Sequence, residues 1–228
     1  MGTGSADSHL LAVRQAGPRG SRDRILCHSS LLEVVVNAAA RRPIVMETDV
    51  SENSRPQVWT VGHSTRPIGE FIALLQSAKI TIVADVRRFP GSRRYPQYNQ
   101  LALADALAAE RIDYVALADL GGRRQPRPDS PHTAWRNASF RAYADYMDTD
   151  AFRHGVERVI TLAAHGGTAL MCSEAVWWRC HRSLNADCLK IRGYPVIHLL
   201  SATKHEAHPY TSAAQIVDGQ LSYASPPE

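Results

Sequence analysis

Hydrophobic residues between positions 58 and 200 follow two alternating patterns. Short apolar runs rich in β-branched residues predict strands, and they cover residues 58–62, 81–86, 114–117, 168–172 and 195–200. Longer stretches in which apolar residues recur every three or four positions predict amphipathic helices. These stretches lie near residues 67–78, 99–110, 140–147, 152–165 and 179–191.

This alternation indicates the fold class. Strand–helix–strand units with right-handed crossovers build a parallel sheet with helices on both faces. The run Thr81–Val86 is almost continuously apolar, which suits a strand that is covered on both faces. We therefore expect an α/β protein with a Rossmann-like, open, mostly parallel five-stranded sheet and helices on both faces.

The periodic pattern is mostly absent from residues 1–55, where Gly, Ser, Arg and Ala are common. We interpret this segment as a disordered or wrongly assigned N-terminal extension, with translation starting at Met46. A transit peptide is the rival interpretation, and the acidic residues Asp7, Asp23 and Glu33 count against it. Residues 56–228 are expected to form a single α/β domain with a polar tail from about residue 201 that wraps the surface.

Composition narrows the class further. Of 228 residues, 44% are hydrophobic and 21% are charged, which is ordinary for a globular protein. No apolar run approaches the ~20 residues that span a bilayer, and no secretory core is present, so we expect neither a membrane protein nor a secreted one. Four cysteines do not suggest a disulfide scaffold, and a reducing, cytoplasmic location is predicted. The net charge of +4 permits a polyanionic partner without requiring one.

Reactive residues follow the predicted strands at one edge of the sheet. Ligands of open α/β sheets bind beyond the carboxyl ends of the strands, so this placement predicts an active site. The candidate catalytic residues are Glu174, Asp85, His63, Cys172, Cys180 and His181. The candidate anion-binding residues are Arg87, Arg123, Arg182, Gly121 and Gly122.

Individual residues allow two interpretations. Asp85 in an apolar strand is either a general base or the partner of Arg87 in an ion pair, and the pair is the better-supported interpretation because a buried carboxylate needs a partner. Cys180 beside His181 at the expected start of a helix is either an activated thiol or a small buried hydrophobe.

A basic loop follows the second strand. Arg87, Arg88, Arg93 and Arg94 offer planar donors for phosphate or carboxylate, and Tyr95 and Tyr98 could stack on a base.

Three chemistries compete at this edge. A phosphatase or sulfurtransferase loop places an arginine six positions after its cysteine, whereas Arg179 follows Cys172 by seven positions. A metal site could draw on His63, Cys172, Cys180 and His181, but the spacing lacks a CxxC pair, so no metal is predicted. Acid/base chemistry by Glu174 and Asp85 beside a bound anion needs no unusual spacing.

Several motifs together resemble a known family. They are Val61-Gly-His-Ser-Thr, Asp85-Val-Arg-Arg-Phe-Pro, Tyr95-Pro-Gln-Tyr-Asn, Asp119-Leu-Gly-Gly-Arg, Phe140-Arg-Ala-Tyr-Ala-Asp-Tyr-Met and Cys172-Ser-Glu through Cys180-His-Arg. Their order from about Val58 to His198 resembles the prokaryotic family called domain of unknown function 488. The resemblance implies a Rossmann-like domain, and it brings no established reaction or cofactor.

We therefore predict an enzyme, a hydrolase or a transferase, that acts on a phosphate-bearing small molecule or nucleic acid. Arg87, Arg123 and Arg182 would hold the anion, while Glu174 or Asp85 would move protons. Two alternatives stay open: a non-catalytic nucleic-acid-binding module, and a thiol-dependent enzyme that uses Cys172 or Cys180. The sequence specifies neither a cofactor nor an oligomeric state.

Overall fold

The computed structural model of the protein describes residues 55–225. The predicted N-terminal extension therefore lies, apart from Arg55, outside the described residues. Within residues 55–225, no helix combines the length and apolar content that a membrane crossing requires.

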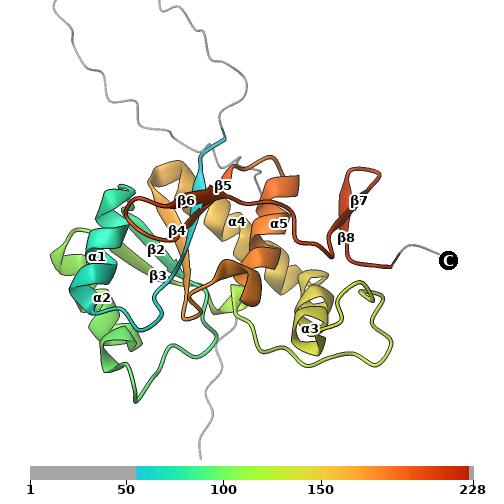
Figure 1. The fold of residues 1–228 in the computed structure, drawn as a ribbon, viewed down its shortest axis with the longest axis horizontal. Helices are drawn as coiled ribbons and strands as arrows, with labels where there is room; N and C mark the ends of the chain where they lie inside the picture. The colour runs from blue at the N-terminus through green and yellow to red at the C-terminus, as the bar shows by residue number, and fades with distance from the viewer. Residues whose placement is uncertain (1–54, 226–228) are drawn as a thin grey trace, which may run out of the picture. The chain divides into compact units, whose positions relative to one another are not determined.

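A six-stranded sheet forms the centre of the described domain (Figure 1), with the strand order β3-β2-β4-β1-β5-β6. The strands are β1 (Val58–Gly62), β2 (Ile82–Asp85), β3 (Asp113–Ala116), β4 (Thr168–Cys172), β5 (Val196–Leu199) and β6 (His205–Ala207). All five predicted strands are present, and neighbours among them pair in parallel. The α/β class with a mostly parallel sheet is confirmed.

The predicted number of strands in the sheet was wrong. Strand β6 pairs antiparallel with β5 at the edge of the sheet, and it lies in the tail that was expected only to wrap the surface. Its three residues, His205, Glu206 and Ala207, are too short and too polar to produce an alternating pattern. A separate hairpin of β7 (Gln215–Val217) and β8 (Gln220–Ser222) follows.

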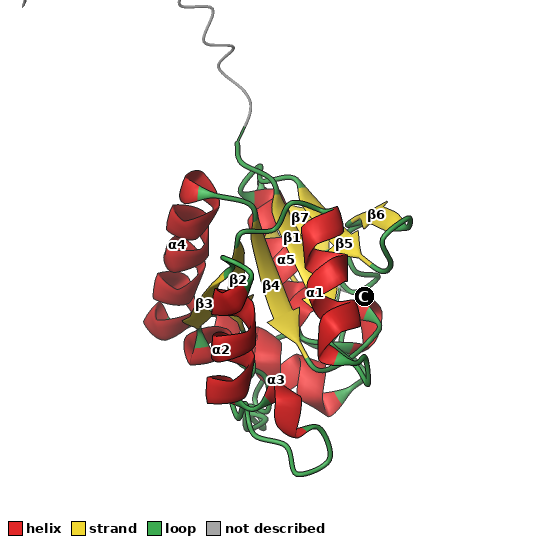
Figure 2. Ribbon diagram, turned by 90° about the vertical axis from the view of Figure 1, so that its left-hand side faces the viewer, coloured by secondary structure: helices red, strands yellow, loops and turns green. Residues whose placement is uncertain are grey.

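Helices cover both faces of the sheet (Figures 1 and 2). They are α1 (Ile68–Ser77), α2 (Gln100–Ala109), α3 (Ala138–Met147), α4 (Asp150–His165) and α5 (Arg182–Ile191). Helices α1 and α2 bury Phe71, Leu75 and Leu103 in one core, which includes Val83 of β2. Helices α3, α4 and α5 bury a second set on the other face: Tyr143, Phe152, Val156, Leu184 and Leu189.

The strand order differs from the doubly wound dinucleotide-binding arrangement in one respect. In that arrangement the first strand lies beside the second, whereas here β4 lies between β1 and β2. Strand β4 is therefore central, and its five residues are all buried. Its carboxyl end delivers Cys172 between the ends of β1 and β2, since Gly62 pairs with Cys172 and Asp85 pairs with Met171.

One helix start differs from the expectation. The helix expected from about residue 179 begins instead at Arg182, after a separate 3₁₀ turn, η3 (Trp177–Arg179). Asn99 stands at the N-cap position of α2, and its side chain does not cap the helix. The Asn99 Oδ1 atom instead accepts a hydrogen bond from the backbone N–H of Ser92 at 2.6 Å, which ties the basic loop to the start of α2.

A buried polar chain fastens the C-terminal segment to the domain. The Asp187 carboxylate on α5 accepts hydrogen bonds from the Thr211 hydroxyl at 2.6 Å and from the Tyr223 hydroxyl at 2.9 Å. It also accepts one from His208 Nε2 at 2.9 Å. Because Asp187 and His208 are buried, these bonds form away from competing water. The tail after residue 200 is thus partly integrated into the fold.

The same chain continues into the sheet. His208 Nδ1 lies 2.9 Å from His198 Nε2, and His198 Nδ1 lies 2.7 Å from Thr60 Oγ1. Since the Asp187 carboxylate can only accept, His208 Nε2 donates to it, and the contact between the two histidines continues the chain to Thr60 in β1. The indole of Trp177 in η3 stacks on the His198 ring at 4.3 Å.

Candidate functional site

A cavity of about 390 Å³ opens at the carboxyl ends of β1, β2 and β4. Most of its lining belongs to four segments: the end of β1, the basic loop after β2, the start of α3, and the loop between β4 and α5. The lining residues are His63, Arg87, Arg88, Phe89, Gly91, Ser92, Tyr95, Gly122, Arg123, Ser139, Phe140, Tyr143, Cys172, Ser173, Glu174, Arg179, Cys180 and His181. Four arginines and one carboxylate are among them, so the wall favours anions.

Asp85 and Arg87 form a buried ion pair beneath the cavity. The Arg87 Nη2 atom donates to Asp85 Oδ2 at 2.6 Å, and Nε donates to Oδ1 at 2.9 Å. The Asp85 carboxylate also accepts from the Arg87 backbone N–H at 3.0 Å and from the Tyr114 hydroxyl at 2.7 Å. With both oxygens engaged, Asp85 is positioned to orient Arg87, while Arg87 itself reaches the cavity wall.

His63 is held in one orientation as a neutral imidazole. Its Nδ1 atom lies 2.8 Å from the carbonyl oxygen of Ser64, so Nδ1 carries the proton, and Nε2 faces Arg87 Nη1 at 3.3 Å. Its ring stacks on Tyr98 at 3.8 Å. Burial lowers the pKa of His63 to about 4, and the nearby charge of Arg87 contributes. His63 therefore contributes an acceptor nitrogen beside the cavity, already used by Arg87.

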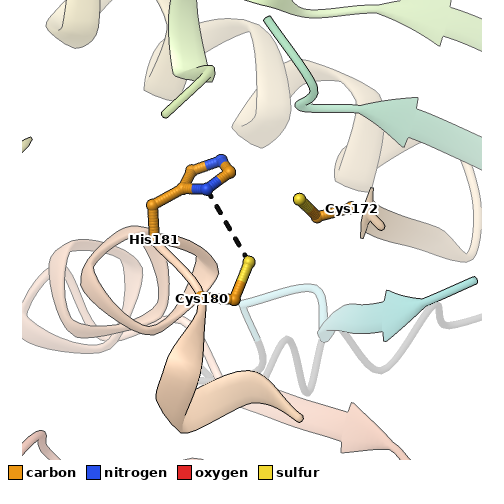
Figure 3. Close-up of side chains that lie close together, drawn as sticks. All are labelled: Cys172, Cys180 and His181. Carbon is orange, nitrogen blue, oxygen red and sulfur yellow. Dashed lines mark hydrogen bonds between the residues drawn. The ribbon is translucent and has the colours of Figure 1, made fainter. Parts of the chain in front are cut away.

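Two thiols and an imidazole converge on one wall (Figure 3). The ligating atoms of Cys172, Cys180 and His181 all lie within 4.8 Å of one another. Cys180 Sγ is 3.7 Å from His181 Nδ1, and His181 Nε2 is 3.1 Å from the carbonyl oxygen of Val86. Because a carbonyl can only accept, Nε2 carries the proton and Nδ1 presents its lone pair to the sulfurs. Strand β4 supplies Cys172, and the turn before α5 supplies the other two residues.

The two thiols differ in acidity. Burial acts to raise the pKa of Cys180, but the hydrogen bond from Cys172 and the charge of Arg182 outweigh it and lower that pKa to about 6. The pKa of Cys172 is raised, because its thiol donates to Cys180 and because it is buried. Burial also lowers the pKa of His181. The pair therefore favours one thiolate, on Cys180, beside a neutral imidazole.

Arg182 stiffens the loop that carries this cluster. Its Nη2 atom donates to the carbonyl oxygen of Glu174 at 2.6 Å, and its Nε atom lies 3.4 Å from Cys180 Sγ. At 1% exposure it does not reach the cavity, unlike Glu174, whose side chain is exposed and lines it. Arg182 thus lies within the wall, whereas Arg87, Arg88, Arg123 and Arg179 line the cavity.

Two glycines permit close approaches that build the site. A Cβ atom at Gly122 would lie 2.9 Å from His181 Nδ1, and one at Gly62 would lie 2.0 Å from the carbonyl oxygen of Glu174. A side chain at either position would displace the cluster or its loop. Gly122 was expected to bind an anion; it lines the cavity, and its contact there is with the His181 ring. Gly121 lies against the backbone of Arg88.

The fold gathers most of the predicted residues. Of the eleven, His63, Arg87, Gly122, Arg123, Cys172, Glu174, Cys180 and His181 line the cavity, whereas Asp85, Gly121 and Arg182 support it from behind. The stacking role suggested for Tyr98 is wrong, because its ring is fully buried against His63.

Several lining residues were not predicted. Arg88 and Phe89 belong to the basic loop, whose position the sequence indicated. Ser139 and Phe140 of α3 also line the cavity, and no sequence pattern predicted this, because a long loop precedes α3 and its length does not fix where the helix packs.

The fold and the cavity define an α/β protein with a mostly parallel sheet and a candidate site at the carboxyl ends of its parallel strands. The family model of Domain of unknown function DUF488 matches residues 67–189, more than half of the 228 residues. The protein therefore belongs to this family, as the motifs indicated. The match includes Arg87, Cys172, Cys180 and His181, while His63 precedes it. No curated protein and no solved structure matches the chain.

Proposed function

We propose that the protein is an enzyme that acts on a phosphate-bearing substrate with a planar group, a nucleotide or a nucleic-acid end, in the cavity at the carboxyl edge of the sheet. The observation that carries the proposal is that one cavity is lined both by arginines and by aromatic rings. Such an enzyme would be a hydrolase or a transferase, working in the reducing cytoplasm.

The arginines supply the anion-binding half of the argument. Arg88, Arg123 and Arg179 line the cavity, and all three are exposed. Guanidinium groups offer planar, bidentate donors that match phosphate oxygens. Arg87 adds a fourth charge whose position is fixed by Asp85.

The aromatic residues supply the other half. Phe89, Tyr95 and Phe140 line the same cavity, and Phe89 is 63% exposed. Exposing so much of a phenyl ring is unfavourable in water, and stacking on a base would cover it. A cavity of about 390 Å³ is within the range of small-molecule sites.

Glu174 is the proton-transfer residue in this proposal. It is the one carboxylate among the cavity-lining residues that the structure describes, whereas Asp85 is fully engaged with Arg87 and Tyr114. An exposed carboxylate beside a bound phosphate can accept or deliver a proton without first breaking an ion pair.

Calorimetry tests the binding step. The full chain is titrated at low salt with mononucleotides, short oligonucleotides and inorganic phosphate. We expect a nucleotide to bind, and Arg179→Ala to weaken it by about tenfold, the loss of one charge-assisted hydrogen bond. Arg158→Ala, which removes an exposed arginine of α4 outside the cavity, is the matched control. Absence of binding across the panel, or an equal effect of both substitutions, would overturn the proposal.

Glu174→Gln separates an enzyme from a binding module. An enzyme of this kind should retain nucleotide affinity in Glu174→Gln and lose conversion of the bound nucleotide, followed by chromatography of the products. A non-catalytic nucleic-acid-binding module, which would use the exposed Arg93 and Arg94, should show no conversion in either form. Conversion that is unchanged in Glu174→Gln would assign proton transfer to another group.

A thiol-dependent enzyme is the second candidate, favoured by the position of both sulfurs at the cavity wall. Alkylation of the reduced, metal-free chain by iodoacetamide tests it. This candidate requires Cys172 or Cys180 to react faster than Cys188, the half-buried cysteine on α5, and requires a bound nucleotide to slow that reaction. Equal, slow labelling of all three would remove it.

A further inference from the structure

We propose that Cys172, Cys180 and His181 bind a zinc ion, with the fourth coordination position open to the cavity. The ion-binding part stands independently of the proposed function, while the identity of the fourth ligand rests on it. The sequence predicted no metal, because the spacing of these residues lacks a CxxC pair. The fold, however, brings their ligating atoms together (Figure 3).

The distances suit a tetrahedral centre. Zinc binds thiolate sulfur at about 2.3 Å and imidazole nitrogen at about 2.0 Å, so a tetrahedral angle places the two ligand atoms roughly 3.6 Å apart. The observed separation of Cys180 Sγ and His181 Nδ1 is 3.7 Å. With all three ligand atoms within 4.8 Å of one another, only small side-chain movements are needed.

The imidazole is already held as a metal ligand requires. Metal-binding histidines donate their second ring N–H to a carbonyl or carboxylate, which fixes the tautomer and the ring orientation. His181 does so through Nε2, toward the Val86 carbonyl oxygen at 3.1 Å. The nitrogen that faces the sulfurs, Nδ1, is therefore the unprotonated one. Glycine at position 122 leaves the space beside Nδ1 free, since a Cβ atom there would come within 2.9 Å of this nitrogen.

The surrounding charge supports two thiolates. Cys172 and Cys180 are only 7% and 4% exposed, and two buried negative charges would be unfavourable without compensation. A divalent cation compensates both, and Arg182 Nε at 3.4 Å from Cys180 Sγ adds a donor to one sulfur. Two thiolates and one imidazole form a donor set that favours zinc over magnesium or calcium.

The geometry leaves room for a fourth ligand. All three residues line the cavity, so the remaining position faces solvent or substrate. Two cysteines, one histidine and an exchangeable ligand make up a catalytic type of zinc site, in which the ion polarises an oxygen or lowers the pKa of bound water. An oxygen of the phosphate that the arginines would hold suits this position.

Zinc titration of the full chain, reduced and stripped with a chelator, tests the site. We expect one ion per chain, measured in competition with a chromogenic chelator. Loss of a residue behind a ligand already costs about 10–100-fold in metal affinity, so Cys172→Ser, Cys180→Ser and His181→Ala should each cost more than about 100-fold. The double variant Cys27→Ser/Cys188→Ser removes the other two cysteines and should bind as the wild type does. Wild-type protein without stoichiometric zinc, or ligand variants that bind equally well, would contradict the site.

Cobalt substitution keeps the test independent of variant folding. Cobalt bound to the wild type and to Cys27→Ser/Cys188→Ser should show the visible bands of a tetrahedral ion and the charge-transfer absorption of two thiolates. A cobalt spectrum without thiolate charge transfer would overturn the assignment. Zinc binding without nucleotide binding would support this site and contradict only the proposed function. Nucleotide binding without zinc binding would contradict this site and leave the proposed function unaffected.

Discussion

At the scale of single residues, the end of β2 illustrates how a buried charge is stabilised. Asp85 is 1% exposed and Arg87 is 8% exposed, and the guanidinium and backbone N–H of Arg87 donate to both carboxylate oxygens. Tyr114 on the neighbouring strand β3 adds a third donor to the carboxylate. Burial and the adjacent Asp85 charge raise the pKa of Tyr114 above its usual value, so its hydroxyl stays a donor.

Asp85→Ala should destabilise the fold through the arginine that it leaves behind. Removal of one partner from a buried ion pair costs about 3–5 kcal/mol, because the other charge remains buried without compensation. We expect a loss of this size in the free energy of unfolding, measured by urea denaturation. The double variant Asp85→Ala/Arg87→Ala should lose less than the sum of the two single variants. Additive losses would show that the two side chains act independently.

The sequence predicted which residues lie near the cavity better than it predicted their contacts. The strand ends identified His63, Cys172 and Glu174 as cavity residues because the backbone direction of a parallel sheet fixes where its ends lie. The partner of each side chain depended on tertiary packing, which no local pattern encodes. Tyr98 therefore looked like an exposed stacking ring, yet it is buried against His63.

At the scale of elements, α5 connects the candidate site to the C-terminal segment. Its N-terminal end follows directly on Cys180 and His181, and its middle carries Asp187. Asp187 accepts hydrogen bonds from side chains at positions 208, 211 and 223. One helix therefore bears both the cluster and the anchor of the tail.

Asp187→Ala should release the C-terminal segment. His208, Thr211 and Tyr223 would each lose a buried acceptor, at about 1–3 kcal/mol per unsatisfied group. We expect faster tryptic cleavage after Lys204, which directly precedes β6, detected by mass spectrometry. Asp105→Ala, on α2 and outside this network, is the control. Cleavage at wild-type rates would show that the segment is held by packing alone.

Sequence patterns predicted elements unevenly for a physical reason. Strands β1, β2, β4 and β5 are largely buried and apolar, so their runs stand out. Strands β6 to β8 have three residues each and are paired through backbone bonds, which leave little signature in side-chain hydrophobicity. The helix expected from about residue 179 begins only at Arg182, because the 3₁₀ turn Trp177–Arg179 and two further residues precede it.

At the scale of the whole molecule, buried neutral histidines make stability depend on pH. Burial lowers the pKa of His198 to about 3, with the neighbouring His208 contributing, and lowers that of His63 to about 4. In the unfolded chain a histidine titrates near about 6.5. Between these values the unfolded chain binds more protons than the folded one, so stability is complete above about pH 6.5 and falls as the pH is lowered.

We expect the free energy of unfolding to drop by on the order of 5 kcal/mol between about pH 6.5 and pH 4, roughly half of it from each histidine. His198→Gln should flatten this decline, because the amide can accept from Thr60 and donate to His208 without titrating. Urea denaturation across this pH range measures both proteins. His154→Gln, which alters an exposed histidine of α4, should keep the wild-type slope. A decline of equal steepness in the wild type and in both variants would show that His198 is not its origin.

The stacking of Trp177 on His198 has a consequence for how this chain can be shortened. A version that stops before residue 205 keeps every residue proposed to touch metal or substrate, and by a motif search it would pass as complete. Asp187 would nevertheless lose its hydrogen bonds from His208, Thr211 and Tyr223. His198, on which the Trp177 indole stacks three positions before Cys180, would lose its contact with His208. Shortening the protein to the part that carries its family motifs would therefore weaken the support of the turn that holds Cys180 and His181.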